Sequence, residues 1–164
     1  MPRAKIRHAG SGLLGASRRP ALPAMFGEVA VRIVSDPKWL RLVRGVVEQS
    51  CLGFGAREES ATAVVLAVNE AVSNVMRHGY GGDTTRPIRI ACRRDGEMIE
   101  VRICDHGIEA EFLSRELLPP DELRAGGRGL YMIRTLMDEI EYRREDGQNR
   151  MYLRKHLQDD VAES

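Results

Sequence analysis

The chain has 164 residues, of which 43% are hydrophobic and 30% charged, and these values are ordinary for one soluble domain. Its three cysteines are an odd number at long spacings, which excludes a complete disulfide framework and a Cys-x-x-Cys metal or redox site. No apolar run approaches the roughly 18 residues of a membrane-spanning helix, so we expect a cytoplasmic protein without a membrane partner.

Charge is distributed unevenly along the chain. The net charge is +1, but residues 1–24 hold five basic and no acidic residues, which leaves 20 basic against 24 acidic in the remaining 140. A domain with that net charge of −4 is unlike a nucleic-acid binder, so no direct nucleic-acid partner is expected. We predict a basic, disordered arm over residues 1–26, one domain over 27–157 and a polar tail over 158–164.

The domain begins with a strand and a helix. Val29, Val31 and Ile33 alternate with other residues, which predicts a half-buried strand. Pro37 follows two capping side chains, and apolar residues then recur at helical spacing, so a helix is predicted from there to Gly53.

A second helix is predicted over residues 58–78, ending where Gly79 can adopt a left-handed conformation. At about 100° per residue its apolar side chains fall on one side, which indicates a buried helix. These side chains are Ala61, Val64, Val65, Val68, Val72, Val75 and Met76.

The second half of the chain contains two hairpin signals and one long connection. Alternating runs at residues 88–92 and 99–103 flank an Asp-Gly turn, and a similar pair at 140–142 and 151–153 flanks another. Residues 106–127 lack periodicity, and a helix is predicted over 129–138. This order predicts an α/β (α+β) two-layer sandwich, with a mixed, mostly antiparallel sheet covered on one face by three helices.

Glu70 and Asn74 are the first candidate site residues. They stand four apart on the second helix, hence on one face, and helical geometry places them opposite the apolar stripe beside Ala63 and Ala67. The alternative is an ordinary solvated face of an amphipathic helix.

Two further segments carry polar chemistry beside glycines. Asp105 is in phase with the apolar residues of its strand, so it points to the buried side, and Gly107 would allow close approach of a ligand. The segment Gly126-Gly127-Arg128-Gly129-Leu130 opens a helix and could bind an anion such as phosphate. The alternatives are a turn aspartate and a flexible hinge.

Together and in this order, these segments resemble the GHKL ATPases. Asn69-Glu70-Ala71-Val72-Ser73-Asn74, followed by Arg77-His78-Gly79-Tyr80, is similar to the N box of that superfamily. Asp105-His106-Gly107 and Gly127-Arg128-Gly129-Leu130 are similar to its two glycine boxes. The chain most resembles the anti-sigma factor serine kinases of bacterial partner-switching systems.

The resemblance implies a Bergerat ATP-binding fold and a role for each matched residue. Asn74 would ligate Mg²⁺ and Asp105 would accept a hydrogen bond from adenine, with Gly107 beside the base. The second glycine box would hold the ATP phosphates through Gly127, Arg128, Gly129 and Leu130, and residues 106–127 would form an ATP lid. Glu70 would be the general base that takes the proton from a partner's serine.

The implied function is that of a protein kinase that binds a sigma factor and phosphorylates a serine on a STAS-type anti-sigma factor antagonist. Homodimerisation is common in the resembled family and is possible here. Glu109 stands where the first glycine box usually has a glycine. Two alternatives therefore remain: a non-catalytic nucleotide-binding module that switches partners, or a detached histidine-kinase-like ATPase domain.

Overall fold

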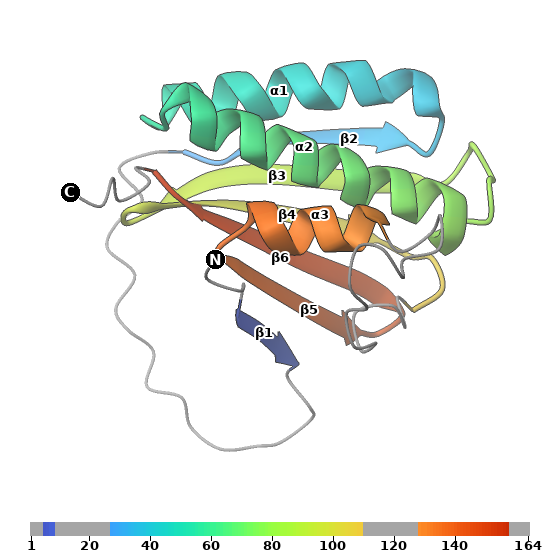
Figure 1. Ribbon diagram of the computed structural model, residues 1–164. Coiled ribbons are helices and arrows are strands. Elements are labelled where there is room, and N and C mark those ends of the chain that lie inside the picture. Colours follow the sequence, from blue (N-terminus) through green and yellow to red (C-terminus); the bar gives the residue numbers. More distant parts are fainter. Residues whose placement is uncertain (1–4, 9–26, 110–127, 158–164) are drawn as a thin grey trace.

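One sheet and one layer of helices make up the protein, as Figure 1 shows. The computed structural model describes residues 5–8, 27–109 and 128–157. The described strands are β1 (Lys5–His8), β2 (Val29–Val34), β3 (Pro87–Asp95), β4 (Met98–Asp105), β5 (Glu139–Glu145) and β6 (Gln148–His156). The described helices are α1 (Leu40–Gly53), α2 (Glu58–Asn74) and α3 (Arg128–Leu136). The predicted two-layer α/β sandwich is confirmed.

The strands follow one another across the sheet in the order β1-β5-β6-β4-β3-β2. β1 and β5 are parallel and the other neighbouring strands are antiparallel, which confirms a mixed, mostly antiparallel sheet. β1 requires one correction to the disordered arm predicted over residues 1–26. Lys5–His8 contains a single aliphatic residue and therefore shows no alternation, and the strand is recognised by its backbone pairing with β5.

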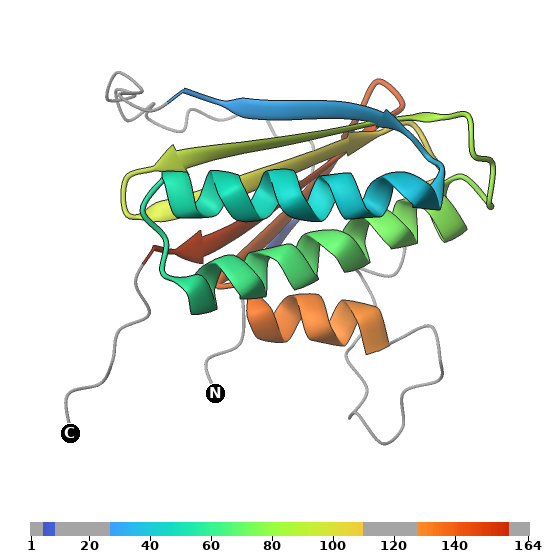
Figure 2. The same ribbon diagram turned by 90° about the horizontal axis from the view of Figure 1, so that it is seen from above.

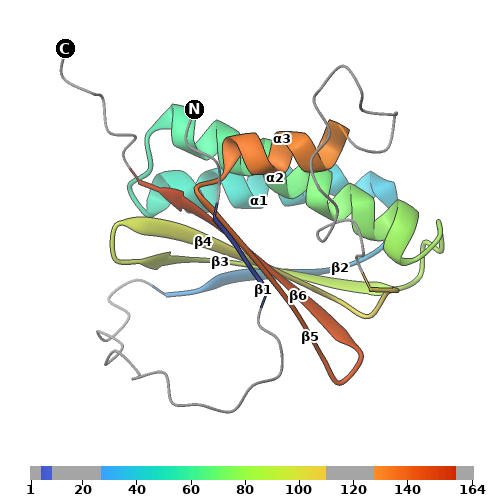
Figure 3. The same cartoon turned by 60° about the horizontal axis from the view of Figure 1, so that its bottom comes forward.

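All three helices cover the same face of the sheet, and α2 lies between α1 and α3 (Figures 2 and 3). The predicted stripe of α2 is largely confirmed, because Val64, Val68 and Val72 are at most 1% exposed, within one core shared with the sheet. Val65 and Val75 are only half-buried. Within the described residues, no helix combines the length and apolar character needed to span a bilayer.

The end of α2 differs from a regular helix. The last turn, Val75–Gly79, is π-helical, and the backbone N–H of Tyr80 donates to the carbonyl of Val75 at 2.8 Å. The expectation that Gly79 is left-handed is wrong, since positive φ occurs two and three residues later, at Gly81 (58°) and Gly82 (85°). A widened helical turn of this kind is often found at functional sites.

Both predicted hairpins form, but only the second has Asp-Gly as its two-residue loop, because Asp95 pairs with Met98 and leaves Gly96-Glu97 as the loop of the first. Gly96 has φ 61° between β3 and β4, while Asp146 (51°) and Gly147 (74°) both have positive φ between β5 and β6. Positive φ at both central residues is the requirement of a type I′ hairpin, which matches the right-handed twist of the strands. These turns fix the register of β3 with β4 and of β5 with β6.

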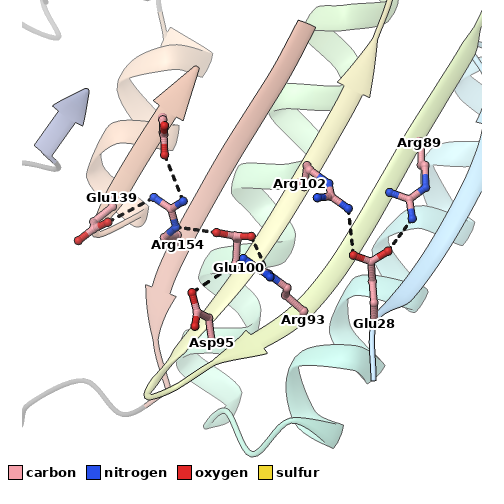
Figure 4. A network of polar contacts seen from close by, with 9 residues as sticks. Glu28, Arg89, Arg93, Asp95, Glu100, Arg102, Glu139 and Arg154 are labelled. Carbon is pink, nitrogen blue, oxygen red and sulfur yellow. Dashed lines mark hydrogen bonds and ion pairs between the residues drawn. The ribbon is translucent and has the colours of Figure 1, made fainter. Parts of the chain in front are cut away.

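The sheet face that the helices leave open carries charged side chains, which Figure 4 shows from close by. Glu100 of β4 is only 2% exposed and lies 2.8 Å from Arg93 of β3 and 2.7 Å from Arg154 of β6. Arg154 also contacts Glu139 at 3.5 Å and Glu141 at 3.2 Å. A buried carboxylate is tolerated here because two guanidinium groups satisfy it.

Candidate active site

Glu70 and Asn74 lie one turn apart near the end of α2. The side chain of Glu70 is 21% exposed, but Asn74 is only 8% exposed and Ala67 is fully buried. The alternative, an ordinary solvated face opposite the apolar stripe, is therefore wrong for two of its members. The reason is tertiary: α3 packs against α2, so α2 has neighbours on more than one side.

Arg77, from the π-helical turn, joins these two side chains. Its Nη2 lies 3.5 Å from Glu70 Oε1 and donates to Asn74 Oδ1 at 3.2 Å. Because the guanidinium carries the charge opposite to that of the Glu70 carboxylate, it holds the pair in one arrangement. Arg77 belongs to the quoted N-box segment, but its spacing alone did not identify it as a site residue.

Asp105 occupies the end of β4 and is 5% exposed, as its phase in the strand predicted. Its Oδ1 accepts hydrogen bonds from the backbone N–H of Gly107 at 2.7 Å and from Asn149 Nδ2 at 2.8 Å. Its Oδ2 has no hydrogen-bond partner among the described residues. A fixed carboxylate with one free oxygen is suited to accept a hydrogen bond from a ligand.

Asn149, on β6 directly opposite Asp105, organises this carboxylate. It is 3% exposed, and its Oδ1 accepts hydrogen bonds from Tyr142 Oη at 2.7 Å and from Arg144 Nη1 at 2.5 Å. The same Arg144 Nη1 donates to the carbonyl of Gly107 at 3.0 Å. With its amide oxygen held in this way, Asn149 must point its NH₂ group towards Asp105.

Gly107 is required by its contact with the protein itself. A Cβ at this position would come within 2.6 Å of the carbonyl oxygen and 2.8 Å of the Cα of Gly79. The same carbonyl accepts a hydrogen bond from the backbone N–H of Ile108 at 3.0 Å. The two glycines therefore bring the end of α2 against the end of β4.

Tyr80 holds the segment after α2 in place. Its hydroxyl accepts a hydrogen bond from the backbone N–H of His106 at 2.8 Å and donates to the carbonyl of Pro87 at 2.6 Å. Arg86 lies 5.1 Å from the centre of its ring. Burial raises the pKa of Tyr80, so the hydroxyl stays protonated and keeps its donor.

The start of α3 contacts the end of α2. A Cβ on Gly129 would come within 2.8 Å of Glu70 Cδ and 2.9 Å of its Cγ, so a side chain here would displace the Glu70 carboxylate from its present position. Arg128 is exposed at the first residue of the helix, whereas Leu130 is 8% exposed and part of the core. Gly127 lies outside the described residues.

The predicted residues therefore form two adjacent groups. One contains Glu70, Asn74 and Gly129, and the other contains Asp105 and Gly107. The π-helical turn Val75–Gly79 connects them, because it begins directly after Asn74 and ends against Gly107. Together they offer an acidic group, an amide oxygen, a fixed carboxylate and the backbone amides in the first turn of α3.

The described residues contain no group of three His, Cys, Asp or Glu side chains that could hold a metal by themselves. A magnesium ion bound together with substrate phosphates needs only one or two protein oxygens. The Asn74 Oδ1, which now accepts from Arg77, is an oxygen of that kind. Magnesium held jointly with phosphates is therefore compatible with this site.

Sequence reasoning missed the residues that support the site, namely Arg77, Asn149, Tyr142 and Arg144. Asn149 could have been suspected, since it is a polar residue in phase with the apolar positions of its strand, like Asp105. Its partnership with Asp105 depends on β6 pairing with β4, and strand order was not predicted.

Comparison with known proteins identifies the relatives of this chain. Residues 33–155 match the family model described as "Histidine kinase-like ATPase domain". A protein named serine-protein kinase RsbW from Listeria monocytogenes is 25% identical over 134 residues, which cover 77% of this chain and 85% of the relative. A protein of the same name from Bacillus cereus is 24% identical over 147 residues, or 85% of this chain and 91% of the relative.

A solved structure agrees on the fold. The crystal structure of the RsbU and RsbW domains of a Mycobacterium tuberculosis protein superposes with a TM-score of 0.59 at 20% identity. The match covers 79% of this chain but only 32% of that longer one.

Proposed function

Because the chain belongs to the histidine kinase-like ATPase domain family, we propose that it is an ATP- and Mg²⁺-dependent protein-serine kinase of the anti-sigma factor type. It would bind a sigma factor and phosphorylate a serine on an anti-sigma factor antagonist. This proposal is supported by relatives that are named serine-protein kinase and to which the chain is similar over most of their length. The structural observation that carries it is the position of Glu70 beside Gly129 and one turn from Asn74.

Each residue of the candidate site would have a separate role in binding ATP and Mg²⁺. Asp105 Oδ2 would accept a hydrogen bond from the adenine amino group, because Asn149 and Gly107 already hold the other oxygen. Asn74 would bind Mg²⁺, and the free amides at the start of α3, with Arg128 beside them, would bind phosphate oxygens. ATP would supply the phosphoryl group, and Mg²⁺ would neutralise its charge.

Glu70 would act as the general base. It would take the proton of the partner's serine hydroxyl as that oxygen bonds to the γ-phosphorus, while the bond to the β-phosphate oxygen breaks and ADP leaves. The base must first separate from Arg77, since the ion pair at 3.5 Å engages one of its carboxylate oxygens and restricts its position. Asn74 must likewise release Arg77 before binding a metal ion.

The test is a phosphotransfer assay with Mg-ATP and the antagonist-like proteins encoded near this chain's gene. We expect phosphoserine on one of them, and we expect Glu70→Gln to abolish the transfer while ATP binding survives. Asp105→Asn should weaken ATP binding itself. Absence of transfer to every candidate by a protein that binds Mg-ATP would refute the kinase.

A second function is favoured by the bridge that Arg77 forms. A side chain that occupies both Glu70 and Asn74 fits a module that binds nucleotide and partner without chemistry. Glu109, which is exposed and stands where relatives of this type usually have glycine, points in the same direction. In that case partner binding would respond to nucleotide and would be unchanged in Glu70→Gln.

A further inference from the structure

A row of arginines crosses the open face of the sheet, at the end of the strands where Asp105 lies. Each residue of the row is directly opposite the next on the neighbouring strand. The row consists of Arg32 of β2, Arg89 of β3, Cys104 of β4, Arg150 of β6 and Arg143 of β5. It thus includes two directly opposed arginine pairs, Arg32 with Arg89 and Arg150 with Arg143.

The two opposed arginine pairs are unfavourable for the sheet. Like charges directly opposite one another on neighbouring strands are destabilising. Elsewhere on the same face each basic row contains acids, as where Glu100 lies between Arg93 and Arg154 (Figure 4). The arginine row contains no acidic residue. Acids outside the row, Glu28, Glu141 and Glu145, pair with Arg89, Arg143 and Arg150, and within the described residues Arg32 is the arginine of the row without an ion pair.

A hollow of about 440 Å³ opens on this part of the face. Four arginines line it, together with Cys104 and His106, and no acidic residue does. These arginines are Arg32, Arg89, Arg102 and Arg150. Two glutamates outside the lining pair with three of these arginines: Glu28 with Arg89 and Arg102, and Glu145 with Arg150. The four positive charges of the lining therefore face two negative charges, which leaves an excess of two positive charges. Arg32 has no ion pair among the described residues.

Glu28 shows which chemistry fits the hollow. Its carboxylate bridges two arginines, with Oε1 2.5 Å from Arg89 and Oε2 3.0 Å from Arg102 (Figure 4). Planar guanidinium groups match carboxylates of this kind in shape as well as charge. A ligand that brings further carboxylates would find Arg32 and Arg150 beside this bridge.

The distance between Arg32 and Arg150 favours an extended peptide over a single small anion as the ligand. Arg32 and Arg150 are three strand spacings apart, on the order of 14 Å, or about four residues of extended peptide. A single-stranded nucleic acid typically stacks its bases on aromatic rings. The aromatic side chain in the lining, Tyr152, has Arg143 and Arg154 at 5.6 Å from its ring centre and is not free for such stacking.

We propose that the arginine row and its hollow are a docking site for an acidic segment of a protein partner, on the sheet face opposite the helices and distinct from the candidate active site. Residues 9–26, which lead to β2, contain arginines but no acidic residue and cannot supply the missing charge. The inference rests on the sheet face alone, so it stands or falls separately from the kinase proposal.

The test uses the full chain and a fluorescein-labelled peptide of alternating glutamate and glycine, measured by fluorescence anisotropy. We expect binding that weakens with added salt, and Arg32→Glu should weaken it by about tenfold or more. Because that change turns a like-charge pair into an opposite pair with Arg89, the melting temperature should stay equal or rise. Arg41→Glu, at an exposed position of α1, makes the same charge change on the other layer and should leave the affinity unchanged.

Cys104 locates the bound peptide. It is half-exposed within the row, whereas Cys51 and Cys92 are buried, so a thiol reagent reports on the hollow. The peptide should slow modification of Cys104 in the native protein and leave it unchanged in Arg32→Glu.

Four results would overturn the proposal. The first is a wild-type protein that does not bind the peptide at low salt, and the second is equal affinity in Arg32→Glu and Arg41→Glu. The third is tighter, Arg32-dependent binding of oligodeoxythymidine, which would make the ligand a nucleic acid. The fourth is a dimer in sedimentation that Arg32→Glu dissociates, which would assign the face to a second copy. The ATP affinity of Arg32→Glu is measured as well. If it equals that of the wild type, any of these results concerns the docking site and not the kinase proposal.

Discussion

Close contact between Gly107 and Gly79 is the tightest constraint at the scale of single residues. Gly107→Ala should destabilise the protein by about 1–3 kcal/mol, because the added methyl group meets backbone atoms that cannot rotate away. Gly45 provides the matched control, since a Cβ there would have nothing within 4 Å, and Gly45→Ala within α1 should stabilise by about 0.5–1 kcal/mol. Urea unfolding measures both changes. Equal effects of the two substitutions would show that the glycine contact is not tight in solution.

Asn149 gives a second prediction at this scale. Asn149→Ala removes one of the two donors to Asp105 Oδ1 and also the amide oxygen that accepts from Tyr142 and Arg144, so it should cost about 1–3 kcal/mol of stability. If Asp105 binds adenine as proposed, the affinity for a fluorescent ATP analogue should also fall by about tenfold. Asn69→Ala is the control, because the Asn69 bond to Arg44 is exposed and should be worth less than about 0.5 kcal/mol. Unchanged affinity in folded Asn149→Ala would remove its positioning role.

The residues proposed to contact ligand could be predicted from sequence better than the residues that support them. Glu70, Asn74 and Asp105 stand in short segments whose spacing and strand phase are visible in the chain. Tyr142, Arg144 and Asn149 act through a pairing between β4, β5 and β6 that no local pattern specifies. Gly107 was identified for a different reason than the one observed, since its neighbour is Gly79.

Among the elements, α2 shows how tertiary packing changes the meaning of a helical pattern. The apolar pattern of a helix considered by itself predicts one buried face. In the protein, α2 packs on the sheet and also lies between α1 and α3. That is why Asn74 and Ala67 are buried although they lie opposite the apolar stripe. The π-helical turn is equally invisible in the spacing, since it depends on Gly79 meeting Gly107.

The charged network across β3, β4 and β6 predicts a pH dependence of stability. Burial alone would raise the pKa of Glu100, but hydrogen bonds from Arg154 and Arg93 outweigh it and hold the pKa below its usual range. A carboxyl with a lowered pKa in the folded state contributes stability above its unfolded pKa of about 4.3, and this contribution is lost as the pH falls through the lower folded value. The wild-type melting temperature should therefore drop below about pH 4.3.

Substitution isolates this effect. Glu100→Gln should lower stability at neutral pH, because two arginines lose their charged partner, and should flatten the acid limb of melting temperature against pH. Glu97→Gln is the control, since Glu97 is 79% exposed in its pair with Arg94 and should change little. An acid limb equally steep in Glu100→Gln would assign the acid sensitivity to other carboxyls.

At the scale of the whole molecule, the cysteines report how firmly the two layers hold together. Cys51 of α1 and Cys92 of β3 are buried, and burial raises the pKa of each thiol to about 12. At pH 8 only about one thiol in ten thousand would then be ionised. Cys104 is half-exposed on the other face; burial raises its pKa too, but Arg102, Arg150 and Arg89 act against that rise.

Reaction with Ellman's reagent should therefore proceed in two phases. One thiol, Cys104, should react in the native protein, and the other two should react only as denaturant separates helices from sheet. Cys104→Ser should remove the first phase and leave the second unchanged. Simultaneous reaction of all three thiols in native buffer would mean that the layers separate readily.

The arrangement of the whole molecule was largely predictable. The spacing of apolar residues distinguishes its helices from its strands, and two Asp-Gly pairs mark its hairpins. The edge strand β1 was not, since Lys5–His8 joins the sheet through backbone groups. The arginine row was missed for the same kind of reason. Its members are scattered along the sequence from 32 to 150 and become neighbours only through strand register.

The turn at Gly96 closes the end of β3 and β4 remote from Asp105, and Leu157 bonds to Glu97 at that same end. The candidate active site and Leu157 therefore lie at opposite ends of one sheet. A fluorescent reporter inserted at the Gly96 turn would therefore lie beside Leu157, at the end of the sheet remote from the candidate active site.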